Sequence, residues 1–206
     1  MTSEECAVRV NVSRETMDRL LKYDAVLMAW SDQHNLVSKS SLDFRWSRHY
    51  LDSLQLYSLL PAGSASLVDL GSGAGFPGLV LAACGLEDGL TVRLIESTGK
   101  KAAFLREAIA AMEIGNCEVV PARIEAVKID PPEIVTARAL SSLDKLCAYG
   151  HGIAARNTRF FFPKGIRAEE ELTQALKSWR MDVTRHQSMT DKDATIFEIT
   201  NLVSRS

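Results

Sequence analysis

The sequence contains only four cysteines, and they are scattered at Cys6, Cys84, Cys117 and Cys147. No C-x-x-C pair or nearby histidine pair accompanies them, so we expect neither a disulfide framework nor a zinc site. No run of residues is apolar and long enough to span a bilayer. These absences predict a globular protein of the reducing cytoplasm that has no metal and no membrane association.

A strong net charge is also lacking, since 24 Lys and Arg residues face 26 Asp and Glu residues, for a formal net charge of -2. The chain as a whole is therefore not attracted to nucleic acid, and any RNA binding must use a local basic face. A length of 206 residues fits one domain with a sizeable core. Because no coiled-coil pattern is present, we expect a monomer.

The most informative stretch is glycine-rich and spans residues 66–82. It begins with the apolar run from Leu67 to Leu70, turns through four glycines, and resumes as an apolar segment at residues 79–83. This order is typical of the strand, glycine loop and helix that open a nucleotide-binding βα unit. Asp69 stands at the carboxyl end of the strand, where ligands bind in open α/β sheets. The four glycines are Gly71, Gly73, Gly75 and Gly78.

Two cofactors compete for this loop. Residues 73–78 fit G-x-G-x-x-G, the dinucleotide fingerprint, whereas residues 69–75 fit D-x-G-x-G-x-G, the pattern of S-adenosylmethionine (SAM) methyltransferases. Glu96, after the next predicted strand, suits the ribose hydroxyls of either cofactor. Asp69 and the lack of a sizeable second domain favour SAM. A nicotinamide-dependent oxidoreductase, testable by fluorescence titration with NADH, and a binding protein without turnover are the alternatives.

The rest of the chain alternates between strand and helix patterns. We predict an α/β fold of the SAM-dependent methyltransferase (Rossmann-like) class: a mostly parallel seven-stranded sheet with helices on both faces and a terminal antiparallel hairpin. The predicted strands are residues 67–70, 91–96, 117–120, 134–138, 159–163, 182–186 and 195–203, and the later predicted helices are residues 98–112, 141–155 and 168–179.

About 60 residues precede the first strand. Residues 1–12 lack a pattern and are expected to be loose, a helix is predicted from Ser13 to about Trp30, and residues 31–41 read as a polar turn. A second helix is predicted from Leu42 to Leu60. We therefore predict a helical extension at residues 1–60 that packs on the sheet, followed by a SAM-binding methyltransferase domain at residues 61–206.

The predicted fourth strand carries the clue to the chemistry. The segment Asp130-Pro-Pro-Glu133 resembles a motif used to methylate exocyclic amines, but it precedes the strand, so we interpret it as a rigid lead-in loop. The carboxyl end of the strand presents Arg138 instead, and no general base or cysteine nucleophile is evident. A nucleophile with a lone pair and no proton, such as guanine N7, needs only alignment with the methyl group.

Several motifs follow one another along the chain. They are Trp30 with Asn35-Leu36, Arg48-His-Tyr-Leu-Asp-Ser53, Asp69 to Gly78, Ser97-Thr-Gly-Lys-Lys101 with Phe104-Leu-Arg106, Arg123 with Glu125, Arg138-Ala139 and Lys164-Gly165. In this order they resemble the motifs of the GidB (RsmG) methyltransferases of bacterial small-subunit ribosomal RNA. Ser31 and Val37 depart from residues that this family often has.

The resemblance implies transfer of a methyl group from SAM to N7 of a guanine in the 530-loop region of 16S ribosomal RNA. Whether free RNA or an assembled small ribosomal subunit is the substrate stays open. The resemblance also implies that Gly71, Phe76, Ile124, Glu125 and Arg138 contact the cofactor. By their positions in the glycine loop and at the strand ends, Asp69, Gly73 and Glu96 are also predicted to belong to the cofactor site.

Cations near predicted strand and helix ends are candidates for holding RNA. Arg138, Arg123 and Lys164 are the candidate catalytic residues, as positioning cations rather than bases. We predict that RNA-binding cations converge at the cofactor mouth: Arg45, Arg48, Lys100, Lys101, Arg123, Arg138 and Lys164. His49 and Asp52 share a helix face, and we expect them to hydrogen-bond to the sheet domain.

Overall fold

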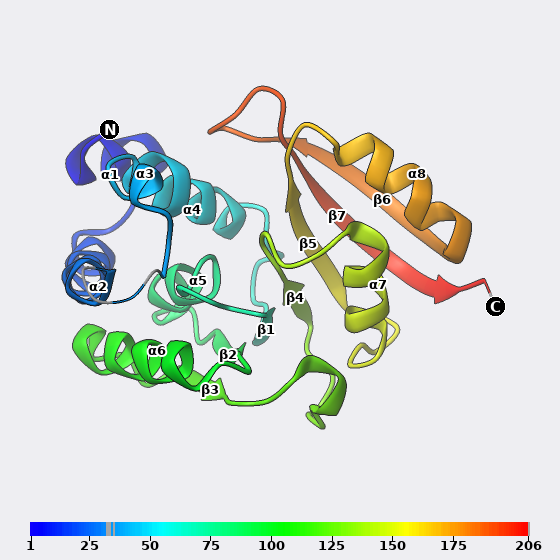
Figure 1. The fold of residues 1–206 in the computed structure, drawn as a ribbon, viewed down its shortest axis with the longest axis horizontal. Helices are drawn as coiled ribbons and strands as arrows, with labels where there is room; N and C mark the ends of the chain where they lie inside the picture. Colours follow the sequence, from blue (N-terminus) through cyan, green and yellow to red (C-terminus); the bar gives the residue numbers. More distant parts are fainter. Residues whose placement is uncertain (32–33, 35, 206) are drawn as a thin grey trace.

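The computed structural model describes residues 1–31, 34 and 36–205. Its centre is a seven-stranded sheet in the order β3-β2-β1-β4-β5-β7-β6 (Figure 1). Five strands are parallel, and β7 is antiparallel to both β5 and β6, which confirms the predicted mostly parallel sheet. The strands are β1 (Ser66–Leu70), β2 (Thr91–Ile95), β3 (Cys117–Val120), β4 (Ile134–Thr136), β5 (Arg159–Lys164), β6 (Trp179–Gln187) and β7 (Thr195–Ser204).

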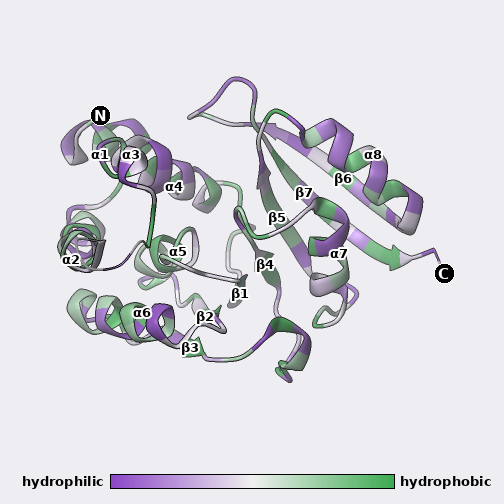
Figure 2. Ribbon diagram, in the orientation of Figure 1, coloured by the Kyte–Doolittle hydropathy of each residue, from purple (hydrophilic) through white to green (hydrophobic). Residues whose placement is uncertain are grey.

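Alternation along the strands divides the interior into two cores, one on each face of the sheet. In β1, Leu67 belongs to the core under α5 (Gly78–Gly85) and α6 (Gly99–Met112). Its neighbour Val68 belongs to the core under α7 (Leu143–His151) and α8 (Ala168–Ser178). Helix α5 is coloured as largely hydrophobic in Figure 2, as expected for a helix with nearly every side chain buried.

The N-terminal helices lie on the α5 and α6 side of the sheet (Figure 1). Tyr23 and Tyr50 share that core with Phe104 of α6, so this segment contributes to the main interior. No helix in the described ranges is both long and apolar enough to cross a membrane. The N-terminal elements are α1 (Ser3–Val10), α2 (Arg14–Ser31), α3 (Lys39–Leu42), the π-helical turn η1 (Trp46–Leu51) and α4 (Asp52–Tyr57).

Two predictions about the N-terminal segment were wrong. Residues 3–10 form a helix rather than a loose end, because Thr2 and Glu5 make a capping box and Cys6 is buried. The single helix predicted over residues 42–60 is divided into a π-helical turn and a short α-helix. Asn35 lies outside the described residues, and the division into residues 1–60 and 61–206 stays a prediction.

The region around β4 differs slightly from the prediction. The strand ends at Thr136, so Arg138 lies in the loop that follows it. The Asp130–Glu133 segment leads into the strand as predicted: the Glu133 N–H donates to Ser66 Oγ at 3.0 Å, and Glu133 Oε2 accepts from the Ala65 N–H at 2.9 Å. It therefore braces the amino ends of β1 and β4, and the carboxyl ends are left for a ligand.

Gly78 at the start of α5 gives a test of this packing. A Cβ at this position would strike the Leu94 side chain and lie 2.8 Å from Asp69 Oδ2. We expect Gly78→Ala to lower the free energy of unfolding by roughly 1–3 kcal/mol, as overpacking does. Urea unfolding measures the change. In the matched control Gly99→Ala, the new Cβ meets no atom within 4 Å, so stability should not fall; equal losses in the two variants would contradict the packing argument.

Candidate functional site

The glycine loop between β1 and α5 is braced by a tyrosine from the N-terminal helices. The Tyr23 hydroxyl donates a hydrogen bond to the carbonyl oxygen of Ala74. At the next residue, Gly75, φ is 92°, and a Cβ there would lie 2.9 Å from the Tyr23 hydroxyl oxygen. Only glycine suits both the backbone angle and the close approach. The shape of the loop therefore depends on α2 as well as on its own glycines.

Phe76, in the same loop, packs among side chains of the N-terminal segment. Its ring centroid lies 5.3 Å from that of Tyr23, 5.1 Å from that of Tyr50 and 5.0 Å from that of His49. The guanidinium carbon of Arg138 lies 5.2 Å from the same centroid. Aromatic packing and a cation–π contact thus fix the loop between α2, η1 and the end of β4.

Asp69 lies beneath the loop and is completely buried. Its Oδ1 accepts a hydrogen bond from Thr136 Oγ1 at 2.8 Å, which joins the ends of β1 and β4. Burial raises the pKa of its carboxyl from 3.8 to about 6, against the opposing effect of hydrogen bonds from Ser72 and Thr136. Among the residues predicted to bind cofactor, Asp69 is the one that does not line the cavity described next.

A cavity of about 790 Å³ opens above the glycine loop, at the carboxyl ends of β1, β2 and β4. Half-buried Tyr149 of α7 and a segment of the α2–α3 connection also line it, and sequence analysis had assigned no site role to either. The Trp30 and Asn35-Leu36 motif was the only signal for that connection. The other predicted cofactor residues all lie on the wall: Gly71, Gly73, Phe76, Glu96, Ile124, Glu125 and Arg138.

Glu96 lies at the base of this cavity and is only 5% exposed. Its Oε2 accepts from the Gly73 N–H at 3.0 Å, and its Oε1 accepts from the Thr98 N–H at 2.7 Å. A carboxylate can accept about four hydrogen bonds, so two acceptor positions are left for a ligand. The Glu96 carboxylate is therefore held in a fixed position beside a glycine loop with left-handed backbone, where it can accept hydrogen bonds from ribose hydroxyls. The residues present fit a nucleoside cofactor.

Arg138 is held by residues of the N-terminal segment. Its Nη1 donates to the Arg48 carbonyl oxygen at 3.0 Å and to Asp52 Oδ2 at 3.1 Å, and its Nη2 lies 3.1 Å from His49 Nδ1. Burial and the nearby Arg138 and Arg48 lower the pKa of His49 to about 4, so the imidazole is neutral at pH 7 and Nδ1 accepts. These contacts confirm the prediction that His49 and Asp52 hydrogen-bond to the sheet domain.

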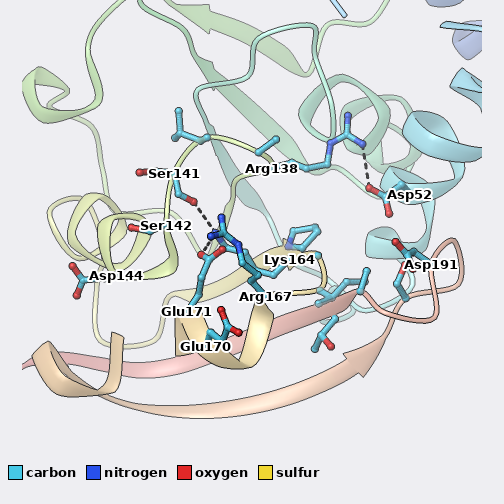
Figure 3. A pocket seen from close by; sticks show the side chains of 18 of the residues that line it. Asp52, Arg138, Ser141, Ser142, Asp144, Lys164, Arg167, Glu170, Glu171 and Asp191 are labelled. Carbon is cyan, nitrogen blue, oxygen red and sulfur yellow. Dashed lines mark hydrogen bonds and ion pairs between the residues drawn. The ribbon is translucent and has the colours of Figure 1, made fainter. Parts of the chain in front are cut away.

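A second, larger cleft of about 1500 Å³ adjoins the cofactor cavity (Figure 3). Its walls are formed by the β4–α7 loop, by α8 along its length and by the β6–β7 turn. The two cavities share four residues, Arg48, Arg138, Ala139 and Leu140, which make up a partition between them. Ala139 has a left-handed backbone (φ 53°), a conformation that costs energy for a residue with a Cβ.

The predicted RNA-binding cations are only partly brought together. Arg48, Lys101, Arg123 and Arg138 line the cofactor cavity. Lys164 lines the adjoining cleft, where its Nζ donates to the Ser141 carbonyl at 2.6 Å and to Glu171 at 2.8 Å. Lys100 and Arg45 line neither cavity, and Arg45 pairs with Asp24 at 2.6 Å. In the part of the chain that the structure describes, no cluster of acidic, His and Cys residues could hold a metal ion.

A family model described as "rRNA small subunit methyltransferase G", GidB, matches residues 16–200. The chain belongs to the GidB family. A curated protein of that name from Rhodospirillum centenum is 46% identical over 198 residues, which cover 94% of this chain and 88% of the relative. Another from Rhodospirillum rubrum is 44% identical and covers 97% of each chain. The predicted family and the rRNA methyltransferase activity are confirmed.

Solved structures with a similar fold are methyltransferases. The ribosomal protein L11 methylase from Lactobacillus delbrueckii subsp. bulgaricus gives a TM-score of 0.60 at 14% identity and covers 75% of this chain and 78% of its own. An O-methyltransferase from Bacillus cereus in complex with SAH gives 0.58 at 14% identity, over 87% and 90%. The predicted fold and the SAM cofactor of this GidB enzyme are confirmed, which removes the nicotinamide alternative.

Burial of Asp69 predicts a specific pH dependence. Because its pKa is higher in the folded than in the unfolded chain, the folded state binds the proton more tightly. This contribution to stability is complete below about pH 4 and is lost as the pH rises to about 6. Asp69→Asn cannot titrate, so the stability of the variant relative to wild type should rise by roughly 1–3 kcal/mol between pH 4 and pH 7. Urea unfolding at several pH values measures this.

The exposed Asp130 gives the control for that series, because Asp130→Asn should show no comparable trend. A constant difference between Asp69→Asn and wild type across this pH range would contradict the raised pKa.

Glu96→Ala tests the ribose assignment. We expect SAM binding to weaken by roughly 1–3 kcal/mol, since the variant removes the anchored acceptor. Isothermal titration calorimetry with SAM measures it directly. Glu118→Ala serves as the control, because Glu118 pairs with Arg93 at 2.6 Å and does not line the cofactor cavity. Wild-type affinity in Glu96→Ala would rule out the assignment.

Proposed function

We propose that this enzyme transfers a methyl group from SAM to N7 of a guanine in the 530-loop region of 16S ribosomal RNA. The observation that carries the proposal is the partition between the two cavities. It consists of two arginines, an alanine and a leucine, none of which accepts a proton near neutral pH. Guanine N7 has a lone pair and no proton, so its methylation needs no base at this position.

The cofactor side is assigned to the cavity above the glycine loop. SAM, when bound, supplies an electrophilic methyl group. Glu96 would accept hydrogen bonds from the ribose, and the backbone around Gly71 and Gly73 would leave room for the ligand. Arg138, which contacts Phe76, separates this cavity from the adjoining cleft. Ile124 and Glu125 also line this cavity. Asp69 holds the strand ends below.

The RNA side is assigned to the cations around the partition. Arg48 and Arg123 are exposed and line the cofactor cavity, which Lys101 of α6 also lines. They are suited to phosphate or to the target base. Lys164 stands in the adjoining cleft but is 9% exposed and paired with Glu171, so it shapes the wall more than it offers a free charge. Catalysis then rests on alignment of N7 with the methyl group. In this proposal the enzyme acts as a cytoplasmic monomer.

Transfer of radiolabelled methyl groups tests the proposal. Unmodified bacterial small subunits, naked 16S RNA, transfer RNA and protein are offered in parallel, and labelled RNA is hydrolysed to its bases. We expect the label in 16S RNA, released as 7-methylguanine. Label at another atom or in another RNA would refute the proposed target while leaving the enzyme class intact.

Arg123→Ala tests the RNA side. We expect KM for the RNA substrate to rise, and the salt dependence of binding to lose about one unit of slope, while the SAM dissociation constant changes little. Arg156→Ala is the control, since Arg156 is an exposed cation that lines neither the cofactor cavity nor the adjoining cleft. The assignment of Arg123 fails if the two variants bind RNA equally well.

A further inference from the structure

Arg138 lines both cavities, so the orientation of its guanidinium affects both. The residue lies in an irregular loop two positions beyond the end of β4, and the hydrogen bonds of the sheet do not fix its side chain. Its side-chain hydrogen bonds reach Arg48, His49 and Asp52 of the N-terminal segment. The orientation of this arginine is therefore set by residues about ninety positions earlier in the chain.

Asp52 has a particular place among these partners. It is the carboxylate that pairs with Arg138 among the described residues, and the two side chains are 18% and 16% exposed. His49 offers Arg138 a neutral nitrogen, and Arg48 offers a backbone carbonyl. Hydrogen bonds that join two charged groups are the stronger kind, so the Asp52 carboxylate is the main electrostatic anchor of the guanidinium.

The same carboxylate also holds the β6–β7 turn. Asp52 Oδ1 accepts from Thr190 Oγ1 at 2.9 Å and from Gln55 Nε2 at 2.9 Å, while Oδ2 is the oxygen that faces Arg138. Gln55 in turn accepts from the Met189 N–H at 2.7 Å. Ser188, Thr190 and Asp191 of this turn line the larger cleft. One side chain from the start of α4 thus contacts both Arg138 in the partition, as Figure 3 shows, and Thr190 in the β6–β7 turn.

We propose that Asp52 is a positioning residue: it fixes the Arg138 guanidinium in the partition and couples that guanidinium to the β6–β7 turn through Thr190. A change at the turn then alters the cofactor cavity. A change in the cofactor cavity likewise alters the turn, because coupling between sites is reciprocal. The effect on SAM rests on the established cofactor alone. The effect on RNA rests on the proposed function, so SAM binding is measured without RNA and the two can fail separately.

Asp52→Asn and Asp24→Asn form a matched pair. Asp24 also belongs to the N-terminal segment and pairs with an arginine, Arg45, but lines neither cavity. We expect Asp52→Asn to raise the SAM dissociation constant roughly tenfold, which corresponds to about 1.4 kcal/mol. Asp24→Asn should lower the melting temperature while SAM affinity stays within twofold of wild type. Equal SAM affinities in the two variants and in wild type would overturn the proposal.

Thr190 tests the coupling separately and keeps the proposal falsifiable if Asp52→Asn does not fold. Thr190→Val removes the hydroxyl that donates to Asp52 and leaves the Asp52–Arg138 pair in place. We expect about a threefold loss of SAM affinity in titration calorimetry without RNA, and recovery in Thr190→Ser, which restores the donor. Wild-type SAM affinity in Thr190→Val would refute the coupling.

A double-mutant cycle completes the test. If Thr190 acts through Asp52, then Asp52→Asn combined with Thr190→Val should bind SAM no more weakly than Asp52→Asn alone. Fully additive losses would show that the two residues act independently, which would overturn the proposal. In the methyl-transfer assay the same variants should raise KM for the small subunit; unchanged KM with altered SAM binding would refute only the RNA part.

Discussion

The contact on which the site most depends is the packing of Phe76 against the N-terminal helices. Phe76 lies in the glycine loop, yet its neighbours are Tyr23, Tyr50 and His49 from outside the sheet domain. With 5% of its surface exposed, it is part of the main core and of the cofactor cavity at once. The N-terminal segment is therefore not an appendage to a finished cofactor site, because it supplies the surface on which the loop is shaped.

Two buried acidic residues near the loop have different roles because their side chains meet different partners. Asp69 lies near the carboxyl end of β1, and Glu96 directly follows β2. Asp69 points into the layer below and bonds to Thr136, whereas Glu96 reaches the cavity wall and is held by the N–H groups of Gly73 and Thr98. Asp69 joins β1 to β4 beneath the site, and Glu96 presents oxygens that are already oriented for a ligand.

Sequence reasoning succeeded where a pattern is local. The glycine loop and the acidic residue after β2 lie within about thirty residues of each other. The alternation of strands and helices is a series of such local units, and the parallel sheet follows from it. Helix α1 was missed because it is short and polar, and its start depends on a capping box formed by Thr2 and Glu5. The partners of Arg45 and Arg138 could not be predicted, because packing between separate segments of the chain decides which carboxylate meets each cation.

The wall of the cofactor cavity begins at Leu36 and ends at Tyr149, and the adjoining cleft extends to Ile196. The main core also joins residues that are far apart in the sequence, since Tyr23 of α2 packs against Phe104 of α6. During synthesis the N-terminal helices leave the ribosome first, without the residues that cover their apolar faces. Their apolar faces are covered only after α6 has been synthesised. A nascent chain of this enzyme consequently lacks the complete wall of its cofactor cavity until Tyr149 has been added.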